Sequence, residues 1–409
     1  MTDLDTFRTE TRAWLEANCP PSMRTPLKSD DEICWGGRKY NFISEDQKNW
    51  LKCMADKGWT VPTWPKEYGG GGLSREQDRI LKKEMSKLGC RIPLTSLGII
   101  MLAPALMKFG TEEQKKKYLP EIARGEIRWC QGYSEPGAGS DLASLKTSAV
   151  DPHPENLSST NKGDHWIVNG SKIWTSYANY ADWIFCLVRT DPTASKRDGI
   201  SFVLFDMTTP GVSTSPIKLI SGSSPFCQTF FDNVRVEKKN LIGELNKGWT
   251  VAKYLLQHER DMIGQSSSSG SDGKKKKSIE QVAKEVYGEE RGKIADAVIR
   301  SKLARFQIRE QAFGLTLMRM GDEAKAGSPP GTTSSIFKYY GSELNKDRRE
   351  LMLTINGMDS LGWEGEEFNG GEMARSWLRT KANSIEGGSS EIQLNIIAKR
   401  VLDLPGVVS

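Results

Sequence analysis

The stretch W-I-V-N-G-S-K-I-W-T, residues 166–175, is rich in β-branched and aromatic side chains and has the length of one β-strand. Similar runs follow it, and turns rich in Gly, Asn, Asp and Pro bound them. These runs are D-W-I-F-C-L-V-R-T (182–190), I-S-F-V-L-F-D-M (200–207) and C-Q-T-F-F-D-N-V-R-V (227–236). Several short strands in succession predict an antiparallel β-barrel or sandwich in this part of the chain.

The segments on either side of the strands have helical periodicity. Before them, capped amphipathic runs such as residues 3–18 and 111–125 predict helices, the second of which should stop at Pro120. Helical periodicity returns from about Gly248. It is interrupted by the low-complexity stretch Q-S-S-S-S-G-S-D-G-K-K-K-K-S (265–278), which we interpret as a mobile surface loop. We therefore predict an α+β chain with an N-terminal all-helical domain (1–129), a middle antiparallel β-barrel domain (130–245) and a C-terminal helical bundle domain (246–409).

The composition argues against several classes of function. The 57 basic and 52 acidic residues are interspersed, whereas nucleic-acid-binding proteins gather positive charge in one stripe. The 7 cysteines lack any C-x-x-C pair and the 3 histidines are dispersed, so we expect neither a disulfide framework nor a metal site. The polar N-terminus is no signal peptide, and no apolar run approaches the ~20 residues that span a bilayer. We expect a cytoplasmic protein that binds neither nucleic acid nor membrane.

Two polar segments around the first strands have features of a ligand site. In Q-G-Y-S-E-P-G-A-G-S-D-L-A-S-L-K-T (131–147), the glycines let backbone amides approach a bulky ligand and the serines supply hydroxyl donors. In N-G-S-K-I-W-T-S (169–176), strand alternation places Trp174 and Ser176 on one face and Thr175 on the other. An aromatic ring beside a hydroxyl suits a flat heteroaromatic cofactor. Taken singly, the first segment is equally a glycine-rich turn and Trp174 a core residue.

Together these segments resemble the acyl-CoA dehydrogenase family, and the resemblance covers nearly the whole chain. Y-S-E-P-G-A-G-S-D and N-G-S-K-I-W-T-S are similar to the two flavin-binding segments of the family. The other landmarks stand in the same order: G-W-T-V-P-T-W-P-K-E-Y-G-G-G-G (58–72), F-G-T-E-E-Q-K-K-K-Y-L-P-E-I-A-R-G-E (109–126), F-F-D-N-V-R-V-E-K-K-N-L-I-G-E-L-N-K-G-W (230–249) and E-G-G-S-S-E-I-Q-L-N-I-I-A-K-R-V-L (386–402).

The resemblance implies an FAD enzyme that acts on an acyl-CoA thioester. It also implies an electron-transfer flavoprotein as electron acceptor and a homo- or hetero-oligomer arranged as a dimer of dimers. By the same resemblance, Ser140 lies where the flavin and the CoA arm meet and so also binds substrate. The cofactor-binding residues that it implies are Tyr133, Ser134, Gly139, Ser140, Trp174, Thr175, Ser176, Ser389 and Glu391.

The catalytic base is the residue on which the sequence is most ambiguous. Many family members carry the base in a Y-E-G-T type stretch near the C-terminus, which points to Glu386. With the downstream I-Q in register, however, Gly387 falls at that place. Other members carry the base on the helix after the β domain, and L-L-Q-H-E-R (255–260) resembles their motif. The resemblance therefore implies Glu259 as the base, with Arg260 holding the CoA arm of the substrate.

Periodicity gives Glu259 separate support. Val251, Ala252 and Leu255 open an apolar stripe at helical spacing, and Glu259 follows Leu255 by four residues. A carboxylate on a buried face has a raised pKa, which suits removal of a weakly acidic α-proton. On the pattern alone, a structural ion pair or a helix-edge Glu remains the other interpretation of Glu259, and a plain surface residue that of Arg260.

Two family features are weak, and they leave alternative functions open. K-E-V-Y-G-E-E-R-G-K (284–293) stands where members have an R-x-x-F-G type turn, and N-G-M-D-S-L-G (356–362) replaces Q-x-x-G-G-x-G. Both features normally bind the adenine half of FAD across a subunit interface. The alternatives to a dehydrogenase that makes a trans-2-enoyl-CoA are an oxidase that uses oxygen and a non-catalytic subunit of a heteromeric enzyme. The departures resemble members that act on bulky, ring-bearing acyl-CoAs such as sterol side-chain fragments.

Overall fold

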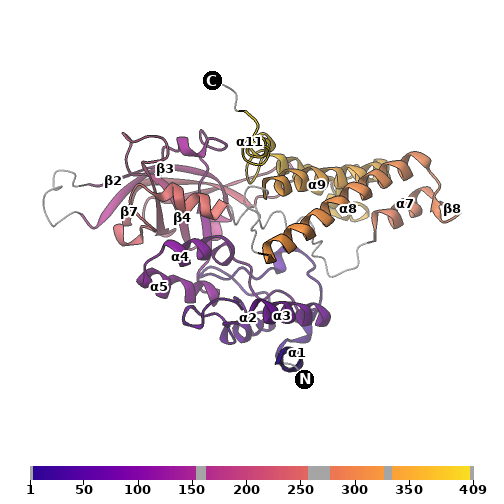
Figure 1. Ribbon diagram of the computed structural model, residues 1–409, viewed down its shortest axis with the longest axis horizontal. Helices are drawn as coiled ribbons and strands as arrows, with labels where there is room; N and C mark the ends of the chain where they lie inside the picture. Colours follow the sequence, from indigo (N-terminus) through magenta and orange to yellow (C-terminus); the bar gives the residue numbers. More distant parts are fainter. Residues whose placement is uncertain (1–2, 153–162, 257–276, 327–333, 406–409) are drawn as a thin grey trace. The chain divides into compact units, whose positions relative to one another are not determined.

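The computed structural model describes residues 3–152, 163–256, 277–326 and 334–405, which fall into two compact units (Figure 1). The first unit contains the N-terminal helices and the large β-sheet. The second contains residues 218–224 and the C-terminal helices. The predicted order of helices, strands and helices is confirmed, while the domain borders at residues 129/130 and 245/246 stay a prediction. Within the described ranges, no helix combines the length and apolar character needed to cross a membrane.

The helices before the sheet begin where the sequence offers side-chain caps. Ser44, Ser74 and Thr111 each accept a hydrogen bond from the backbone N–H three residues on, which satisfies one of the free donors at a helix start. In α3 and α5 a glutamine completes a reciprocal capping box. The helices are α1 (Asp3–Asn18), α2 (Glu45–Asp56), α3 (Arg75–Leu88), α4 (Ala103–Phe109) and α5 (Glu112–Ala123).

Helix α5 continues through Pro120, so the predicted stop at this residue is wrong. The proline lacks the N–H that would bond one turn back, but its carbonyl still accepts from Arg124 N at 3.0 Å. Leu119 and Ile122, on either side of it, have no exposed surface. Burial of these side chains outweighs the one missing hydrogen bond, because each buried leucine or isoleucine contributes roughly 1.5–3 kcal/mol.

The strands form one seven-stranded sheet, in which β1, β4, β2, β3, β7 and β6 are neighbours in that order and β5 adds to β4. The pairing is antiparallel, β4 with β5 included, except that β4 runs parallel to β1 and meets β2 in parallel at one position. The strands are β1 (Trp129–Gly132), β2 (Ser148–Val150), β3 (His165–Ser176), β4 (Trp183–Arg189), β5 (Ile200–Asp206), β6 (Val212–Ile217) and β7 (Phe226–Glu237).

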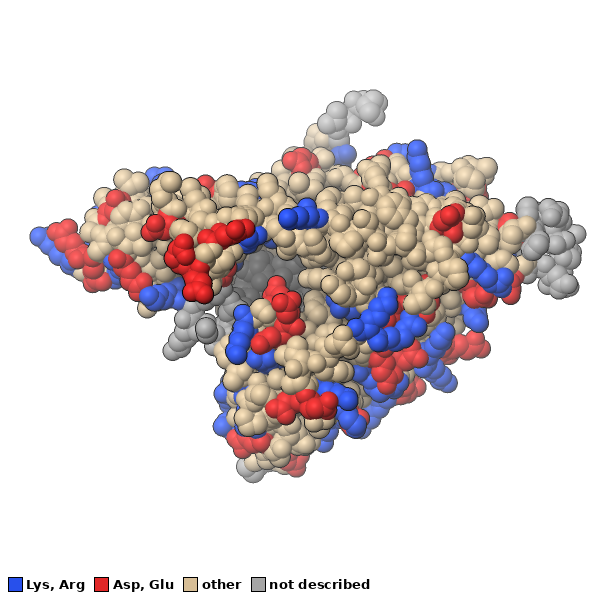
Figure 2. Space-filling model, turned by 180° about the vertical axis from the view of Figure 1, so that it is seen from behind, with Lys and Arg blue, Asp and Glu red and all other residues tan. Residues whose placement is uncertain are grey.

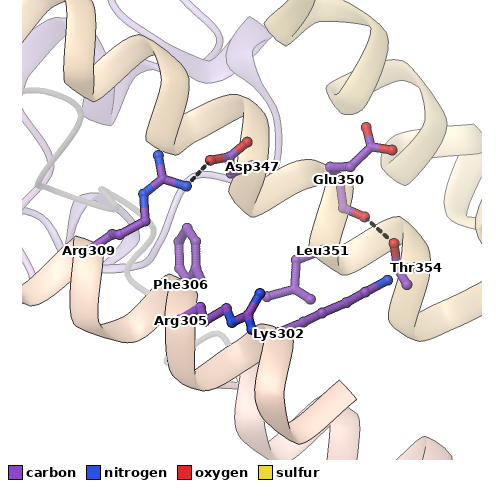
Figure 3. Close-up of a pocket in the computed structure, with 8 residues that line it drawn as sticks. All are labelled: Lys302, Arg305, Phe306, Arg309, Asp347, Glu350, Leu351 and Thr354. Carbon is purple, nitrogen blue, oxygen red and sulfur yellow. Dashed lines mark hydrogen bonds and ion pairs between the residues drawn. The ribbon is translucent and has the colours of Figure 1, made fainter. Parts of the chain in front are cut away.

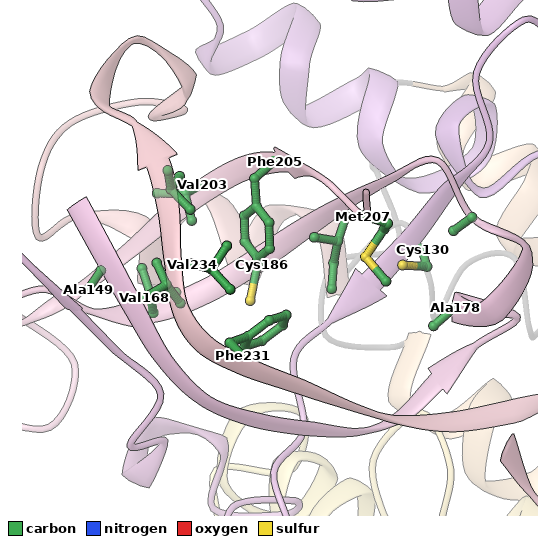
Figure 4. Close-up of a cluster of buried hydrophobic side chains, with 14 of the residues drawn as sticks. Cys130, Ala149, Val168, Ala178, Cys186, Val203, Phe205, Met207, Phe231 and Val234 are labelled. Carbon is green, nitrogen blue, oxygen red and sulfur yellow. The ribbon is translucent and has the colours of Figure 1, made fainter. Parts of the chain in front are cut away.

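The sheet curls around an apolar core, in which side chains from neighbouring strands meet (Figure 4). Phe205 and Phe231 pack edge to face, with ring centroids 5.3 Å apart. Cysteines on β1, β4 and β7 lie in this cluster as small apolar residues, and burial raises the pKa of the Cys186 thiol to about 12. The described cysteines are all free thiols. The inside of the curled sheet is therefore filled by packed apolar side chains.

The second unit is a helical bundle with its own core. Its apolar cluster joins α8 and α9 through residues such as Phe313 and Phe337, whose ring centroids are 5.8 Å apart. Of the predicted loop over residues 265–278, residues 265–276 lie outside the described residues, and Ser278 caps α7. The elements are α7 (Ile279–Tyr287), β8 (Glu289–Glu290), β9 (Lys293–Ile294), α8 (Ala297–Lys325), α9 (Ser334–Asn356), α10 (Glu372–Thr380) and α11 (Ser390–Arg400).

Arg375 on α10 holds two loops of the second unit together. Its guanidinium stacks 3.8 Å from the centroid of the Trp363 ring. It also donates to three backbone carbonyls, of Ser221 (3.0 Å), Trp363 (3.2 Å) and Gly370 (2.8 Å). A planar fork of donors on an aromatic face is a geometry that a lysine ammonium cannot reproduce.

We expect Arg375→Lys to lower the free energy of unfolding of the second unit by about 2 kcal/mol, because carbonyl acceptors lose their donors. Urea unfolding followed by helical circular dichroism measures this loss, and hydrogen exchange should quicken in residues 218–224. The matched control is Arg305→Lys on the exposed surface of α8, which should cost less than about 0.5 kcal/mol. Equal losses in the two variants would contradict an anchoring role for Arg375.

Charges on the surface are mixed. Figure 2 shows Lys and Arg side chains interspersed with Asp and Glu over one face of the molecule, without a stripe of one sign on that face. Many neighbouring charges are paired at short range, such as Arg124 with Glu126 at 2.7 Å. Exposed pairs of this kind contribute little to stability individually.

Candidate functional site

A β-bulge in β3 brings Trp174 to the surface. Between Lys172 and Thr175, β3 advances three residues while its partner β7 advances only two, from Thr229 to Cys227. Trp174 takes up the extra residue with a left-handed backbone, at φ 60°, and its side chain is 52% exposed. Large aromatic residues rarely adopt this conformation, and such strain gathers at functional sites. The bulge thus presents a flat ring on the outside of the sheet.

The residues next to Trp174 take opposite sides of the sheet. Thr175 has no exposed surface, and its hydroxyl has no hydrogen-bond partner in the structure. Ser176 is half-buried. Trp174 itself packs edge to face on Phe226, with centroids 6.0 Å apart. The structure therefore places Thr175 in the interior, while Trp174 and Ser176 keep exposed surface on either side of it in the sequence.

The glycine-rich segment after β1 forms an open loop. Glu135 and Ala138 exchange backbone hydrogen bonds of 3.0 and 3.1 Å, which close a tight turn. A Cβ atom built at Gly137 or Gly139 would have no heavy atom of the described residues within 4 Å, so the described part of the chain leaves space beside the loop. Ser140 is exposed, and Tyr133 is buried at the start of the loop.

The structure brings this loop against β3. Ile173 N donates to Ser134 O at 2.8 Å, so the loop joins β3 immediately before the bulge. The two segments that the sequence marks as ligand-binding, about forty residues apart, therefore lie side by side.

The C-terminal segment begins α11. The Ser389 hydroxyl caps this helix by accepting from Ile392 N at 3.3 Å. Glu391 lies in the first turn, where hydrogen bonds from its own backbone N–H and from the Ser389 hydroxyl lower its pKa. An ionised carboxylate at a helix start is electrostatically favourable.

Glu386, the alternative base, forms an ion pair with Arg379. Arg379 holds both of its carboxylate oxygens, at 2.8 and 3.3 Å, and the Asn383 side-chain amide donates to one of them. The next residue, Gly387, has a left-handed backbone at φ 64°, which a residue with a Cβ rarely adopts. Glu386 thus occupies a structural pairing, and the position after it suits glycine.

Helix α9 fixes the loop that precedes α11. Lys338 is almost fully buried and donates to Asn383 O at 2.8 Å. Burial lowers the pKa of Lys338, although nearby carboxylates, Glu386 first among them, oppose this. About two turns on, Lys346 bonds both Glu343 and the Ser384 hydroxyl. This network defines the position of residues 383–390.

Glu259 and Arg260 lie outside the described residues. The helix that precedes them begins at residue 248 and is described to residue 256. Val251, Ala252 and Leu255 are buried in it, at 2%, 0% and 0% exposure. The first half of the predicted apolar stripe is therefore observed, on the helix whose sequence continues to Glu259.

A separate cavity of about 310 Å³ lies between α8 and α9 (Figure 3). Lys302, Arg305 and Arg309 line it from α8 and Asp347 and Glu350 from α9, and Arg309 pairs with Asp347 at 2.5 Å. None of the residues predicted from the sequence as site residues lines this cavity, and we assign it no part in the site.

Comparison with known proteins decides the family. Models of acyl-CoA dehydrogenases match the N-terminal domain at residues 2–126, the middle domain at 130–234 and the C-terminal domain at 246–402. This chain belongs to the acyl-CoA dehydrogenase family. It is 33% identical over 407 residues to the acyl-CoA dehydrogenase IpdE1 of Mycolicibacterium smegmatis, and the match covers 99% of each chain.

Solved structures of family members agree. The steroid acyl-CoA dehydrogenase Tcur3481-Tcur3483 has a TM-score of 0.74 at 31% identity, covering 99% of this chain and 98% of that one. The ChsE4-ChsE5 complex of Mycobacterium tuberculosis has a TM-score of 0.71 at 28% identity, covering 100% and 99%. Family members are FAD-dependent, so this chain is a flavoprotein oxidoreductase that dehydrogenates an acyl-CoA in lipid metabolism.

The residues present fit FAD. An isoalloxazine ring needs a flat apolar surface and nearby polar donors, and the β3 bulge supplies an exposed indole beside the half-buried Ser176. At Gly137 and Gly139 of the glycine loop next to it, no described residue blocks the approach of a ligand to the backbone.

Sequence reasoning missed two residues of this region, Glu135 and Lys172. Both are buried and charged, and they pair at 2.8 Å directly behind the loop and the bulge. A signal was present in the sequence: Lys172 stands inside a β-branched, aromatic run, where a lysine is unusual unless it has a buried partner.

Proposed function

We propose that this chain catalyses FAD-dependent α,β-dehydrogenation of an acyl-CoA thioester to a trans-2-enoyl-CoA, with Glu259 as the base. The observation that carries the proposal is that the C-terminal segment offers no free carboxylate at the place of the usual base. Glu386 is held by Arg379 and Asn383, and Gly387 stands at the place where many family members have their base. The carboxylate must then come from another element, and Glu259 is the candidate on the helix after the sheet.

In this mechanism the chain's residues orient the thioester and remove a proton. Glu259 takes the α-proton, and a carboxylate kept from water is a stronger base for this step. FAD, when bound, would supply the hydride acceptor. Trp174 and Ser176 would hold one side of the flavin, while Tyr133 and Ser134 would hold it from the loop. Thr175 contributes through its main chain, because its hydroxyl is in the interior.

Further residues bind FAD and the CoA arm of the substrate in this proposal. Gly139 and Ser140 lie where flavin and the CoA arm meet, and the guanidinium of Arg260 pairs with the CoA arm. Ser389 and Glu391, at the start of α11, are further cofactor-binding residues in this proposal.

We propose a bulky, ring-bearing acyl-CoA as the substrate class. The related structure at 31% identity is a steroid acyl-CoA dehydrogenase, and its match extends over 98% of that chain. A glycine at residue 387 in place of a long side chain leaves more room beside the thioester than the usual base would.

We also propose an oligomer built as a dimer of dimers, in which a related chain completes the adenine end of the FAD site. The two features that bind this end are weak in the sequence, and the ChsE4-ChsE5 relative is a complex of two different chains. A homo-oligomer is the alternative. An electron-transfer flavoprotein as acceptor and a cytoplasmic location complete the proposal.

Anaerobic titration of the purified protein tests this function. We expect yellow protein with about one FAD per chain, bleached by a ring-bearing acyl-CoA faster than by straight-chain acyl-CoAs. Slow reoxidation in air, with fast reoxidation by an electron-transfer flavoprotein, supports a dehydrogenase. Rapid reoxidation in air would show an oxidase. A chain that binds FAD only with a partner and is never bleached would be the non-catalytic subunit.

A further inference from the structure

A buried ion pair lies behind the two segments that line the proposed flavin site. The Lys172 side chain has no exposed surface and that of Glu135 is 9% exposed, yet both carry charges. Burying a charge costs several kcal/mol unless a partner and hydrogen bonds compensate it, and an apolar pair is often as stable. Stability alone therefore does not explain why charges occupy this place.

Both members of the pair make further hydrogen bonds to the backbone around them. Lys172 Nζ donates to Glu135 Oε1 at 2.8 Å and to Tyr133 O at 3.1 Å. The Glu135 carboxylate also accepts from the backbone N–H groups of Lys146 (2.7 Å) and Thr147 (2.9 Å). Four contacts thus converge on two side chains.

These contacts fix both ends of the glycine loop. Glu135 is at the beginning of the loop and Lys146 and Thr147 are at its end, so one carboxylate closes the loop at its base. Lys172, on β3, bonds Glu135 and so connects this closed loop to the strand. The next residue, Ile173, also bonds the loop, through Ser134 O. The bulge that exposes Trp174 follows at once. The pair therefore connects the loop and the bulge by side chains that lie on the inner side of the sheet.

We propose that Lys172 and Glu135 are positioning residues for the cofactor, which hold the glycine loop and the β3 bulge in the one relative placement that FAD binds. The proposal rests on the flavin placement of the proposed function. Neither side chain reaches the surface on which FAD would lie, so their effect is indirect.

The titration of Glu135 agrees with this role. Burial raises the pKa of Glu135, but the charge of Lys172 and the hydrogen bonds to the carboxylate outweigh it, so the pKa is lowered overall. A lowered pKa means that the pair contributes fully above the unfolded-state pKa, near 4.5, and that this contribution is lost as the pH falls further. Acid release of FAD should therefore depend on Glu135.

The test compares FAD affinity and fold stability in three single variants of the full chain. Lys172→Met and Glu135→Gln remove a charge with little change of shape. Val203→Ala, in the same apolar core on β5, lowers stability without touching the pair. Fluorescence quenching gives the FAD dissociation constant, visible circular dichroism of bound FAD reports its orientation, and thermal unfolding gives stability. We expect about a tenfold weaker FAD affinity and an altered flavin spectrum in the first two, and less than about a threefold change in the control.

One further result supports the proposal. We expect FAD release from the wild-type protein to rise as the pH falls below about 4.5, and Glu135→Gln should flatten this rise. If Lys172→Met does not fold, Glu135→Gln decides the question, since its amide can still accept a backbone hydrogen bond.

Three results would overturn it. These are unchanged FAD affinity in folded Glu135→Gln, an equal loss in Val203→Ala, and a bound-flavin spectrum that no variant changes. The failure of the proposed function is distinguishable: wild-type protein that binds FAD but is not bleached by any acyl-CoA removes that function and leaves the positioning role standing. Wild-type protein without FAD affinity, both alone and in its oligomer, removes both.

Discussion

Glu259→Gln should slow the anaerobic reduction of bound flavin by an acyl-CoA about 10³-fold, because a positioned general base contributes roughly 10²–10⁴ to a rate. A glutamine amide has nearly the shape of the carboxylate but does not accept the α-proton. The measurement is stopped-flow bleaching of the flavin at saturating substrate, so that a change in binding does not enter the rate. FAD content and substrate affinity should stay within about threefold of the wild-type values.

The matched control for this variant is Glu386→Gln. The Glu386 carboxylate bonds Arg379 and Asn383, and about a third of its side chain is exposed. Its loss should cost less than about 1 kcal/mol of stability and leave the bleaching rate within about threefold. The opposite pattern, with a large loss in Glu386→Gln and little in Glu259→Gln, would place the base in the C-terminal segment and refute our assignment.

Much of the fold follows from patterns in the sequence, because each zone has one clear period. The strand-like runs became one sheet, and capping residues such as Ser74 and Thr111 mark helix starts. Pro120 shows where local rules fail, since tertiary burial of its neighbours outweighs a lost hydrogen bond. The parallel pairing of β1 with β4 is also invisible locally, because it joins segments more than fifty residues apart.

In the candidate site, too, some features follow from local sequence patterns and others do not. Alternation alone predicts that Trp174 and Ser176 share a face, and their exposure agrees. Alternation also predicts that Lys172 shares it, but Lys172 is fully buried. The bulge between them changes the parity, and a left-handed tryptophan has no sequence signal comparable to a glycine. The Glu135–Lys172 pair was missed for a related reason, because which buried charges meet is decided by the folding of distant segments.

Trp174→Gly should weaken FAD binding about 30-fold, because stacking of a planar heterocycle on an aromatic ring contributes roughly 1–3 kcal/mol. The same change should leave the stability of the FAD-free protein nearly unaltered. The indole is 52% exposed, so only about half of its surface is buried and lost to packing. Glycine also adopts the backbone φ of 60° without the cost of about 1–2 kcal/mol that a side chain incurs there. Equilibrium dialysis of FAD and thermal unfolding of the FAD-free protein measure the two quantities.

Trp174→Ala and Trp174→Phe separate the ring from the backbone. The alanine variant loses the ring but keeps the left-handed strain, so it should be about 1 kcal/mol less stable than the glycine variant and bind FAD equally weakly. This reverses the usual order in strands, where alanine is the more stable of the two. The phenylalanine variant keeps a flat ring and should lose less than about fivefold in FAD affinity. If FAD affinity followed stability across the three variants instead, the indole would be a packing residue of the bulge, and the flavin would have to lie elsewhere on the sheet.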